Sequence, residues 1–213
     1  MWLWCEFVNM AEEEVALKLA ENTIPRQLQH GEFRFIRLFN PTTGKFPKAG
    51  KEPMDKGWPT EMNYAYTDSY IVKHVNRRNN YGVLPRGQMC ILDVDDIEQL
   101  VQLDNEGKIS FKELFQDTFT VISGHKSGNH GHYYFRTSSK RWNGKKIILT
   151  NPDTGDHLGE IYMSDFSGFV VGPNSMHDHG NRYVANDKEI VNISTRDFEK
   201  FINSSAIDAV TTA

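Results

Sequence analysis

The chain has 213 residues, of which 38% are hydrophobic and 24% are charged, the composition of an ordinary globular protein with a sizeable core. Its formal net charge of -4 excludes a global attraction to nucleic acid, so any such binding must come from local basic patches. Cys5 and Cys90 lie far apart without a CxxC spacing. This spacing fits neither a disulfide framework nor a cysteine-ligated zinc site, and it favours a reducing, cytoplasmic location.

The first segment, "MWLWCEFVNM", is apolar, but it lacks a basic region and continues directly into the acidic "AEEE". It is therefore a poor signal peptide and too short to span a bilayer, and we interpret it as packing surface or as the lead into a helix. The next residues, "AEEEVALKLAENTI", have helical spacing, and Pro25 ends that helix.

Residues 32–39, "EFRFIRLF", alternate in the manner of a strand. A loop rich in proline and glycine follows, with lysines at positions 45, 48, 51 and 56. Residues 67–78, "TDSYIVKHVNRR", then predict a short helix capped by Thr67 or Asp68. We group residues 1–80 as an N-terminal α/β unit that carries a basic loop.

From Tyr81 onward the pattern changes to strands, at "QMCILDVD", "TFTVIS", "HYYFRT", "KIILT", "GEIYM" and "GFVVGP". The segment "DDIEQLVQLDNEGKISFKELF", between the first two, is helical. We therefore predict an α/β (α+β) protein whose residues 81–190 form a mixed-sheet catalytic core with an acidic metal site. Residues 191–213 weaken in pattern and are expected to be a C-terminal tail or the start of a linker.

An apolar run ends in "LDVDD", with Asp93 and Asp95 on one face of the expected strand and Leu92 and Val94 on the other. Carboxylates crowded in this way repel one another and resist burial unless cations or protons neutralise them. A divalent cation such as Mg²⁺, which prefers hard oxygen ligands, suits this arrangement. An acidic helix cap at Asp96 is the ordinary alternative explanation for part of the cluster.

Two further segments contain polar groups that suit phosphate chemistry. In "SGHKSGNHGHYYF" a glycine-rich turn precedes a strand with His130, His132 and Tyr134 on one face, an arrangement suited to phosphate beside a metal. In "GEIYMSDFSGFVVGPNSMHDHGNRY" two acids compete for a third metal-binding position. Asp165 lies in a turn, where an Asx-type hydrogen bond explains it, whereas Glu160 enters an extended apolar segment and is the better candidate.

Five elements occur in order: "KEPMDKGW", "NYGV", "LDVDD", "HYYF", and "GEIY" with "VVGPNSMHDHGNRY". Together they resemble the bifunctional primase-polymerase (prim-pol) domains of the archaeo-eukaryotic primase superfamily, found in plasmid and viral replication proteins. The resemblance implies a catalytic core similar to RNA-recognition folds, packed on the N-terminal unit, with template and nucleotide between them. It also implies a template-dependent nucleotidyltransferase that synthesises or extends primers on single-stranded DNA.

By the same resemblance, the metal-binding carboxylates for two Mg²⁺ or Mn²⁺ ions are Asp93, Asp95 and Glu160. The expected nucleotide-binding residues are His132, His130, Ser127, His177 and Lys51, with His132 as the main contact. The basic patch in "RTSSKRWNGKK" supplies the expected DNA-binding residues, which are Lys140, Arg141, Lys145 and Lys146, joined by Lys48 from the basic loop. Partners would be a single-stranded DNA template, nucleoside triphosphates and a helicase domain or protein. Two departures from the family pattern are His130, where many relatives have serine, and an extra "SGH" at Ser123 to His125. They leave His130 and His125 as alternatives to His132 for the histidine of this motif.

Two alternative functions remain open at this point. A rolling-circle initiator endonuclease would use "HGH" (His130, His132) to bind a metal and Tyr70 of "YIVK" as nucleophile, although Gly131 and the order of the motifs count against it. A non-catalytic single-strand-binding module would stack bases on Trp58, Trp142 and Tyr133, but it leaves the acids without a purpose.

Overall fold

A computed structural model describes residues 23–42, 49–125 and 128–212. The predictions for the apolar first segment and for nearly all of the expected first helix fall outside these residues. The strands of the described part are β1 (Phe33–Arg37), β2 (Tyr81–Pro85), β3 (Met89–Val94), β4 (Thr120–Ile122), β5 (Gly131–Arg136), β6 (Lys146–Thr150), β7 (His157–Tyr162), β8 (Val170–Val171), β9 (Val184–Ala185), β10 (Val191–Asn192) and β11 (Asp208–Thr212). The helices are η1 (Arg26–Leu28), α2 (Ser69–Asn76), α3 (Ile97–Asn105), α4 (Phe111–Phe115), η2 (Lys140–Trp142) and α5 (Thr195–Ile202).

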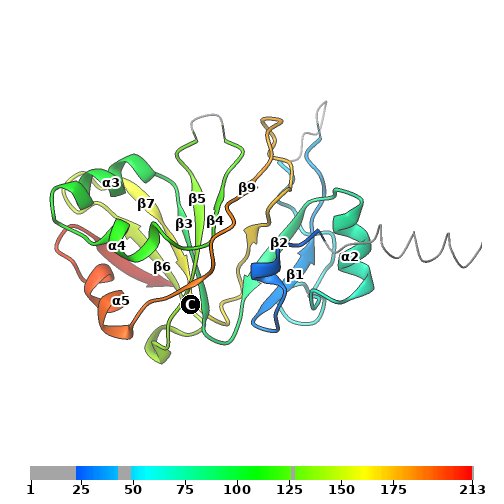
Figure 1. The fold of residues 1–213 in the computed structure, drawn as a ribbon, viewed down its shortest axis with the longest axis horizontal. Helices are drawn as coiled ribbons and strands as arrows, with labels where there is room; N and C mark the ends of the chain where they lie inside the picture. Colours follow the sequence, from blue (N-terminus) through cyan, green and yellow to red (C-terminus); the bar gives the residue numbers. More distant parts are fainter. Residues whose placement is uncertain (1–22, 43–48, 126–127, 213) are drawn as a thin grey trace, which may run out of the picture.

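These strands form two sheets, and the predicted mixed α+β class is confirmed. The larger sheet has eight strands in the order β11-β6-β7-β3-β5-β4-β9, with β10 added alongside β5. The smaller sheet has the order β1-β2-β8. Figure 1 shows α3, α4 and α5 on the side of the larger sheet that faces away from the smaller one, and α2 on the outer side of the smaller sheet.

Strand β3 is central in the larger sheet and contributes to a different core on each face. Cys90, Leu92 and Val94 pack with the helices on one face, in a core that also contains Phe115 and Phe198. Ile91, on the opposite face, belongs to a second core shared with β1, β2 and α2. This alternation follows from the two-residue period of a strand, and it leaves Asp93 on the face that meets the smaller sheet.

Several predicted elements are found where the pattern placed them. The alternating segment forms β1, and α2 begins after Asp68, whose carboxylate accepts a 2.8 Å hydrogen bond from the backbone N–H of Tyr70. The single helical segment predicted after β3 is two helices, α3 and α4. Between them Gly107 has φ +70°, a conformation that glycine adopts without strain and that ends α3.

Strand pairing connects residues on the two sides of each expected domain boundary. Strand β2 begins at Tyr81, but it pairs with β1 and β8 and therefore belongs to the sheet of the N-terminal unit. Residues 195–212 are not a loose tail: α5 buries Phe198, Phe201 and Ile202, spaced along one helix face, and β11 pairs with β6. Their weak pattern in the sequence reflects a short helix and an edge strand.

Within the described part of the chain, no helix is both long enough and apolar enough to cross a membrane.

Candidate active site

The candidate site lies where the apolar core between the two sheets gives way to polar residues. Ile91 on β3 is opposite Tyr134 on β5 and Tyr162 on β7, and the first two are fully buried. Two residues further along β3, on the same face, Asp93 is opposite His132 on β5 and Glu160 on β7. The pairing of three strands therefore places two acids and a histidine in one row across the sheet.

Gly159 permits the close approach of β7 to β3 that this row requires. Its φ is +150°, and a Cβ atom at this position would lie 2.3 Å from the backbone oxygen of Asp93. Real Cβ atoms do not approach so closely, so any side chain here would push β7 away from β3. The glycine immediately before Glu160 thus positions that carboxylate beside Asp93.

The acids that follow in "LDVDD" have different surroundings. Asp95 lies just after β3, with its carboxylate 2.9 Å from Nε2 of His157 and 3.5 Å from Nδ1 of His130. Asp96 instead caps α3, because its side chain accepts a hydrogen bond from the backbone N–H of Gln99. The helix cap accounts for Asp96, whereas Asp93 and Asp95 both border one cavity.

The electrostatics of the site are those of crowded acids with few counter-charges. Burial and the neighbouring Asp95 raise the pKa of Asp93 to about 7, and Glu160 adds to the shift. Burial, with a smaller effect of Lys51, lowers the pKa of His132 to about 3. Its Nε2 lies 3.4 Å from Oδ1 of Asp93. His132 is therefore a neutral imidazole near pH 7, and it does not supply the positive charge that these acids need.

The nearest cation to Glu160 is Lys146, whose Nζ lies 2.7 Å from Oε1. The hydroxyl of Tyr162 donates a 2.9 Å hydrogen bond to Oε2 of the same carboxylate. Lys146 was expected to contact DNA, but in the structure it contacts the acid. Of the other basic residues in that patch, the guanidinium of Arg141 and the ammonium of Lys145 lie 4.7 and 5.6 Å from the ring centre of Trp142.

A cavity of about 350 Å³ opens beside this row of polar residues. Its lining residues come from both sheets and from the loops that join them. They are Lys51, Asp93, Asp95, Ser123, His125, His130, His132, Tyr162, Phe169, Val170, Val171, His177 and Tyr183. Glu160, which contacts Lys146 and Tyr162, is not part of the lining. The cavity thus brings together Lys51, His130, His132 and His177, which the sequence analysis selected as nucleotide contacts.

A model of the bifunctional DNA primase/polymerase N-terminal domain matches residues 23–197. The chain belongs to the bifunctional DNA primase/polymerase (Prim-Pol) family. The resemblance stated from its motifs is confirmed, and membership indicates DNA primase or polymerase activity in general. No curated protein matches the chain.

Asp165, the competitor of Glu160 for the third metal-binding position of this Prim-Pol chain, lies apart from the cavity. Asp165 is in a turn with φ +63°, where its carboxylate accepts a 3.2 Å hydrogen bond from the hydroxyl of Ser164, and it does not line the cavity. The expected turn is confirmed, but the hydrogen bond comes from the side chain of the preceding residue. Ser127 and Lys48 fall outside the described residues.

The structure weakens both alternative functions. Trp142 and Tyr133, the expected stacking surfaces of a binding module, are 8% and 9% exposed and belong to the core on the opposite face of the sheet. Trp58 packs edge to face against Phe169 at 5.0 Å between ring centres. Tyr70, the nucleophile of an initiator endonuclease, lies on α2 and does not line the cavity that holds His130 and His132.

Several residues at this Prim-Pol site were not among the predicted site residues. His157, at the start of β7, contacts Asp95, and the ring of Tyr183 stacks on His132 at 5.6 Å between centres. His125 also lines the cavity. The extra "SGH" was the only signal for His125, and nothing in the local pattern of His157 or Tyr183 indicated a contact that depends on distant strands.

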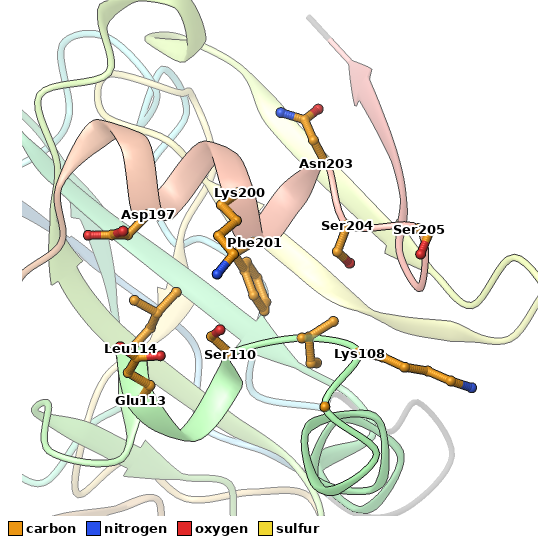
Figure 2. Close-up of a pocket in the computed structure, with 12 residues that line it drawn as sticks. Lys108, Ser110, Glu113, Leu114, Asp197, Lys200, Phe201, Asn203, Ser204 and Ser205 are labelled. Atoms are coloured by element: carbon orange, nitrogen blue, oxygen red, sulfur yellow. The ribbon is translucent and has the colours of Figure 1, made fainter.

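A second cavity of about 350 Å³ lies between α4 and α5, on the face of the larger sheet away from the site. Figure 2 shows Phe201 and Lys200 from α5 facing Glu113 and Leu114 from α4 and Ser110, which directly precedes α4. Its lining has charges of both signs, from Lys108, Lys200, Glu113 and Asp197, and includes no histidine. It therefore offers no counterpart to the acid and histidine row of the first cavity.

Proposed function

We propose that this chain is a template-dependent nucleotidyltransferase that synthesises or extends primers on single-stranded DNA, in plasmid or viral replication. The described fold would then be one functional module, with its catalytic centre between the two sheets. The observation that carries the proposal is the row formed by His132, Asp93 and Glu160 across three strands. Asp95 follows just after β3, and His132, Asp93 and Asp95 border one cavity.

The three carboxylates of the site suit the divalent cations that Prim-Pol enzymes use. Asp93, Asp95 and Glu160 offer only carboxylate oxygens, the ligands that Mg²⁺ and Mn²⁺ prefer. Burial and the neighbouring acids raise the pKa of Asp93 more than Lys51 and Lys146 lower it, so the negative charge there is only partly compensated within the protein. When bound, two such ions supply charge stabilisation and activation of the primer hydroxyl for an in-line displacement at phosphorus.

The protein's own residues then have separate roles in the proposal. Asp93 and Asp95 would hold the cations, and Glu160, which is paired with Lys146 in this structure, would be the third ligand. A neutral His132 donates one N–H to a triphosphate oxygen, and Lys51, which also lines the cavity, adds positive charge there. His130 and His177 line the same cavity as further nucleotide contacts. The template strand follows the basic patch formed by Lys140, Arg141, Lys145 and Lys146.

The test is primer synthesis on circular single-stranded DNA, with ribonucleotides and deoxynucleotides supplied separately. Replacing both Asp93 and Asp95 by Asn should reduce transfer below about 1% of wild type, because bound ions supply several kcal/mol of transition-state stabilisation. Asp165→Asn is the matched control, since it removes a nearby acid that is outside the cavity, and it should retain activity. Equal activity of the double variant would contradict the proposal.

The same assay separates the alternative functions. A covalent protein–DNA adduct that disappears in Tyr70→Phe would indicate an initiator endonuclease. Template binding without any transfer by the wild-type chain, with either nucleotide class, would indicate a binding module. Both outcomes would overturn the proposed activity.

A further inference from the structure

A group of histidines stands beside the carboxylates, and its chemistry is different. His177, Asp178 and His179 follow one another in a tight turn, in which the N–H of His177 donates to the carbonyl of Asn181 at 2.7 Å. One ligand atom from each of these three side chains lies within 4.8 Å of the other two. His177 is buried, whereas Asp178 and His179 are exposed, so the group is open to solvent on one side.

A fourth donor comes from a separate loop. The ring centre of His125 lies 4.9 Å from that of His179 and 5.8 Å from that of His177. Gly124 permits this close approach because it has no side chain: a Cβ atom there would lie 2.7 Å from the carbonyl oxygen of Asn181 and 2.8 Å from Cβ of His177. The backbone of the 123–125 loop is thus in direct contact with the turn that carries the other ligands.

The contacts within the turn also call for a cation or a proton. Nδ1 of His177 lies 2.6 Å from Oδ1 of Asp178 and 3.3 Å from the backbone nitrogen of His179, which donates to it. If Nδ1 accepts that N–H, it has no proton of its own, and two acceptor atoms then stand 2.6 Å apart. A cation that binds both atoms relieves this repulsion.

We propose that His177, Asp178 and His179, together with His125, bind one transition-metal ion, with Zn²⁺ preferred, at the rim of the cavity. Three imidazoles and one carboxylate form a nitrogen-rich set that suits Zn²⁺, whereas the all-oxygen set of Asp93, Asp95 and Glu160 suits Mg²⁺ or Mn²⁺. The ligand atoms of His177, Asp178 and His179 already lie within 4.8 Å of one another, and the exposed side chains of Asp178 and His179 can rotate to reach the separations of a zinc site. The ion would tie the 123–125 loop to the 177–181 turn.

The experiment measures metal binding by the full chain, with any affinity tag removed and millimolar Mg²⁺ present to occupy the carboxylates. Titration with Co²⁺, followed by its visible absorption, and competition with Zn²⁺ should give one site per chain. Replacing a residue that only supports a metal ligand commonly costs 10- to 100-fold in affinity. Loss of a ligand in His179→Ala, Asp178→Asn or His125→Ala should therefore cost at least about 10-fold.

Two controls make the result specific. His30→Gln removes a histidine that packs against Phe33, outside the cavity, and should bind Zn²⁺ as the wild type does. The double variant Asp93→Asn with Glu160→Gln disables the proposed catalytic metal site and should also keep Zn²⁺ affinity. Absence of a Zn²⁺ site in the wild type, or binding lost in the double variant but kept in His179→Ala, would overturn the proposal. None of these readouts depends on nucleotide transfer, so a failure of the proposed enzyme activity would leave this test intact.

Discussion

The contact between Lys146 and Glu160 adds a second role to Lys146, which the sequence suggested only as a DNA-binding residue. In the structure the ammonium of Lys146 neutralises Glu160, and both side chains are only about one-fifth exposed. Removing one partner of a buried pair leaves an uncompensated charge, so the pair is stable until another cation replaces the lysine. We therefore expect Lys146 to be the counter-ion of Glu160 in the metal-free protein, and to be released toward phosphate groups when metal binds.

Substitutions of the two acids of "GEIYMSDFSGF", Glu160 and Asp165, should have different effects on nucleotide transfer and metal binding. Glu160→Gln keeps the shape of the side chain but removes the charge that holds the cation, so it should abolish nucleotide transfer and weaken Mn²⁺ binding. Asp165→Asn should do neither, because Asp165 lies in an exposed turn outside the cavity. Mn²⁺ affinity followed by electron paramagnetic resonance, beside the primer assay, measures both effects. Activity lost in Asp165→Asn and kept in Glu160→Gln would place the third ligand in the turn.

At the scale of elements, the site depends on the spacing of β3 and β7. The two strands are antiparallel, and their register places Glu160 opposite Asp93 and Gly159 opposite Val94. A sheet transmits a local displacement along its hydrogen-bonded ladder, so a clash at one position shifts the neighbouring pair as well. The geometry of the two carboxylates is therefore set by a residue that carries no functional group.

Gly159→Ala tests this dependence. The new methyl group would collide with the backbone oxygen of Asp93, so we expect a loss of roughly 1–3 kcal/mol in unfolding free energy and a marked decrease in Mn²⁺ affinity. Gly155→Ala is the matched control, because Gly155 also has a positive φ, +76°, but nothing lies within 4 Å of a Cβ placed there. It should cost about 1 kcal/mol of stability and leave Mn²⁺ affinity unchanged. Equal metal affinity in the two variants would show that the close approach is not what positions Glu160.

At the scale of the whole molecule, the acids occupy the end of the core between the two sheets. The face of β3 that carries Asp93 also carries Ile91, which is fully buried against the smaller sheet. Packing of the smaller sheet thus removes water from one side of Asp93 and raises its pKa. Folding and ionisation of Asp93 are in conflict here, because the burial that shapes the cavity also penalises the charged carboxylate.

Because of this conflict, we expect the unfolding free energy of the metal-free protein to depend on pH. The pKa of Asp93 rises from 3.8 to about 7 on folding. The protonated form is therefore favoured in the folded state, and its stabilising contribution is complete below pH 3.8 and lost as pH rises through about 7. The side chain is still 28% exposed, so water screens part of the effect and we expect a loss on the order of 2 kcal/mol.

Urea denaturation in EDTA at pH 5 to 8 measures this contribution. The wild type should lose stability relative to Asp93→Asn as pH rises, and millimolar Mg²⁺ should reduce the difference. Asp165→Asn should follow the wild type at each pH. A difference between wild type and Asp93→Asn that stays constant from pH 5 to pH 8 would show that Asp93 is not buried as the structure has it.

The local pattern of the sequence was sufficient for the elements that carry the site. Alternation in "QMCILDVD" and "HYYFRT" predicted β3 and β5 and the faces of Asp93 and His132, because side-chain direction along a strand depends only on its two-residue period. The helix cap at Thr67 or Asp68 and the turn at Asp165 were also predictable, because both depend only on neighbours within a few residues. The motif order was sufficient for the Prim-Pol family.

Contacts between distant segments were decided only by the tertiary structure. The association of Lys146 with Glu160, of His157 with Asp95, and of His125 with the 177–181 turn depends on strand register and loop packing, which no local pattern encodes. Residues 195–212 join the core for the same reason, since a short helix and an edge strand gain their stability from the sheet that they cover or extend. The sequence alone therefore determined which chemical groups were available, and the pairing of strands far apart in the chain decided which of them meet.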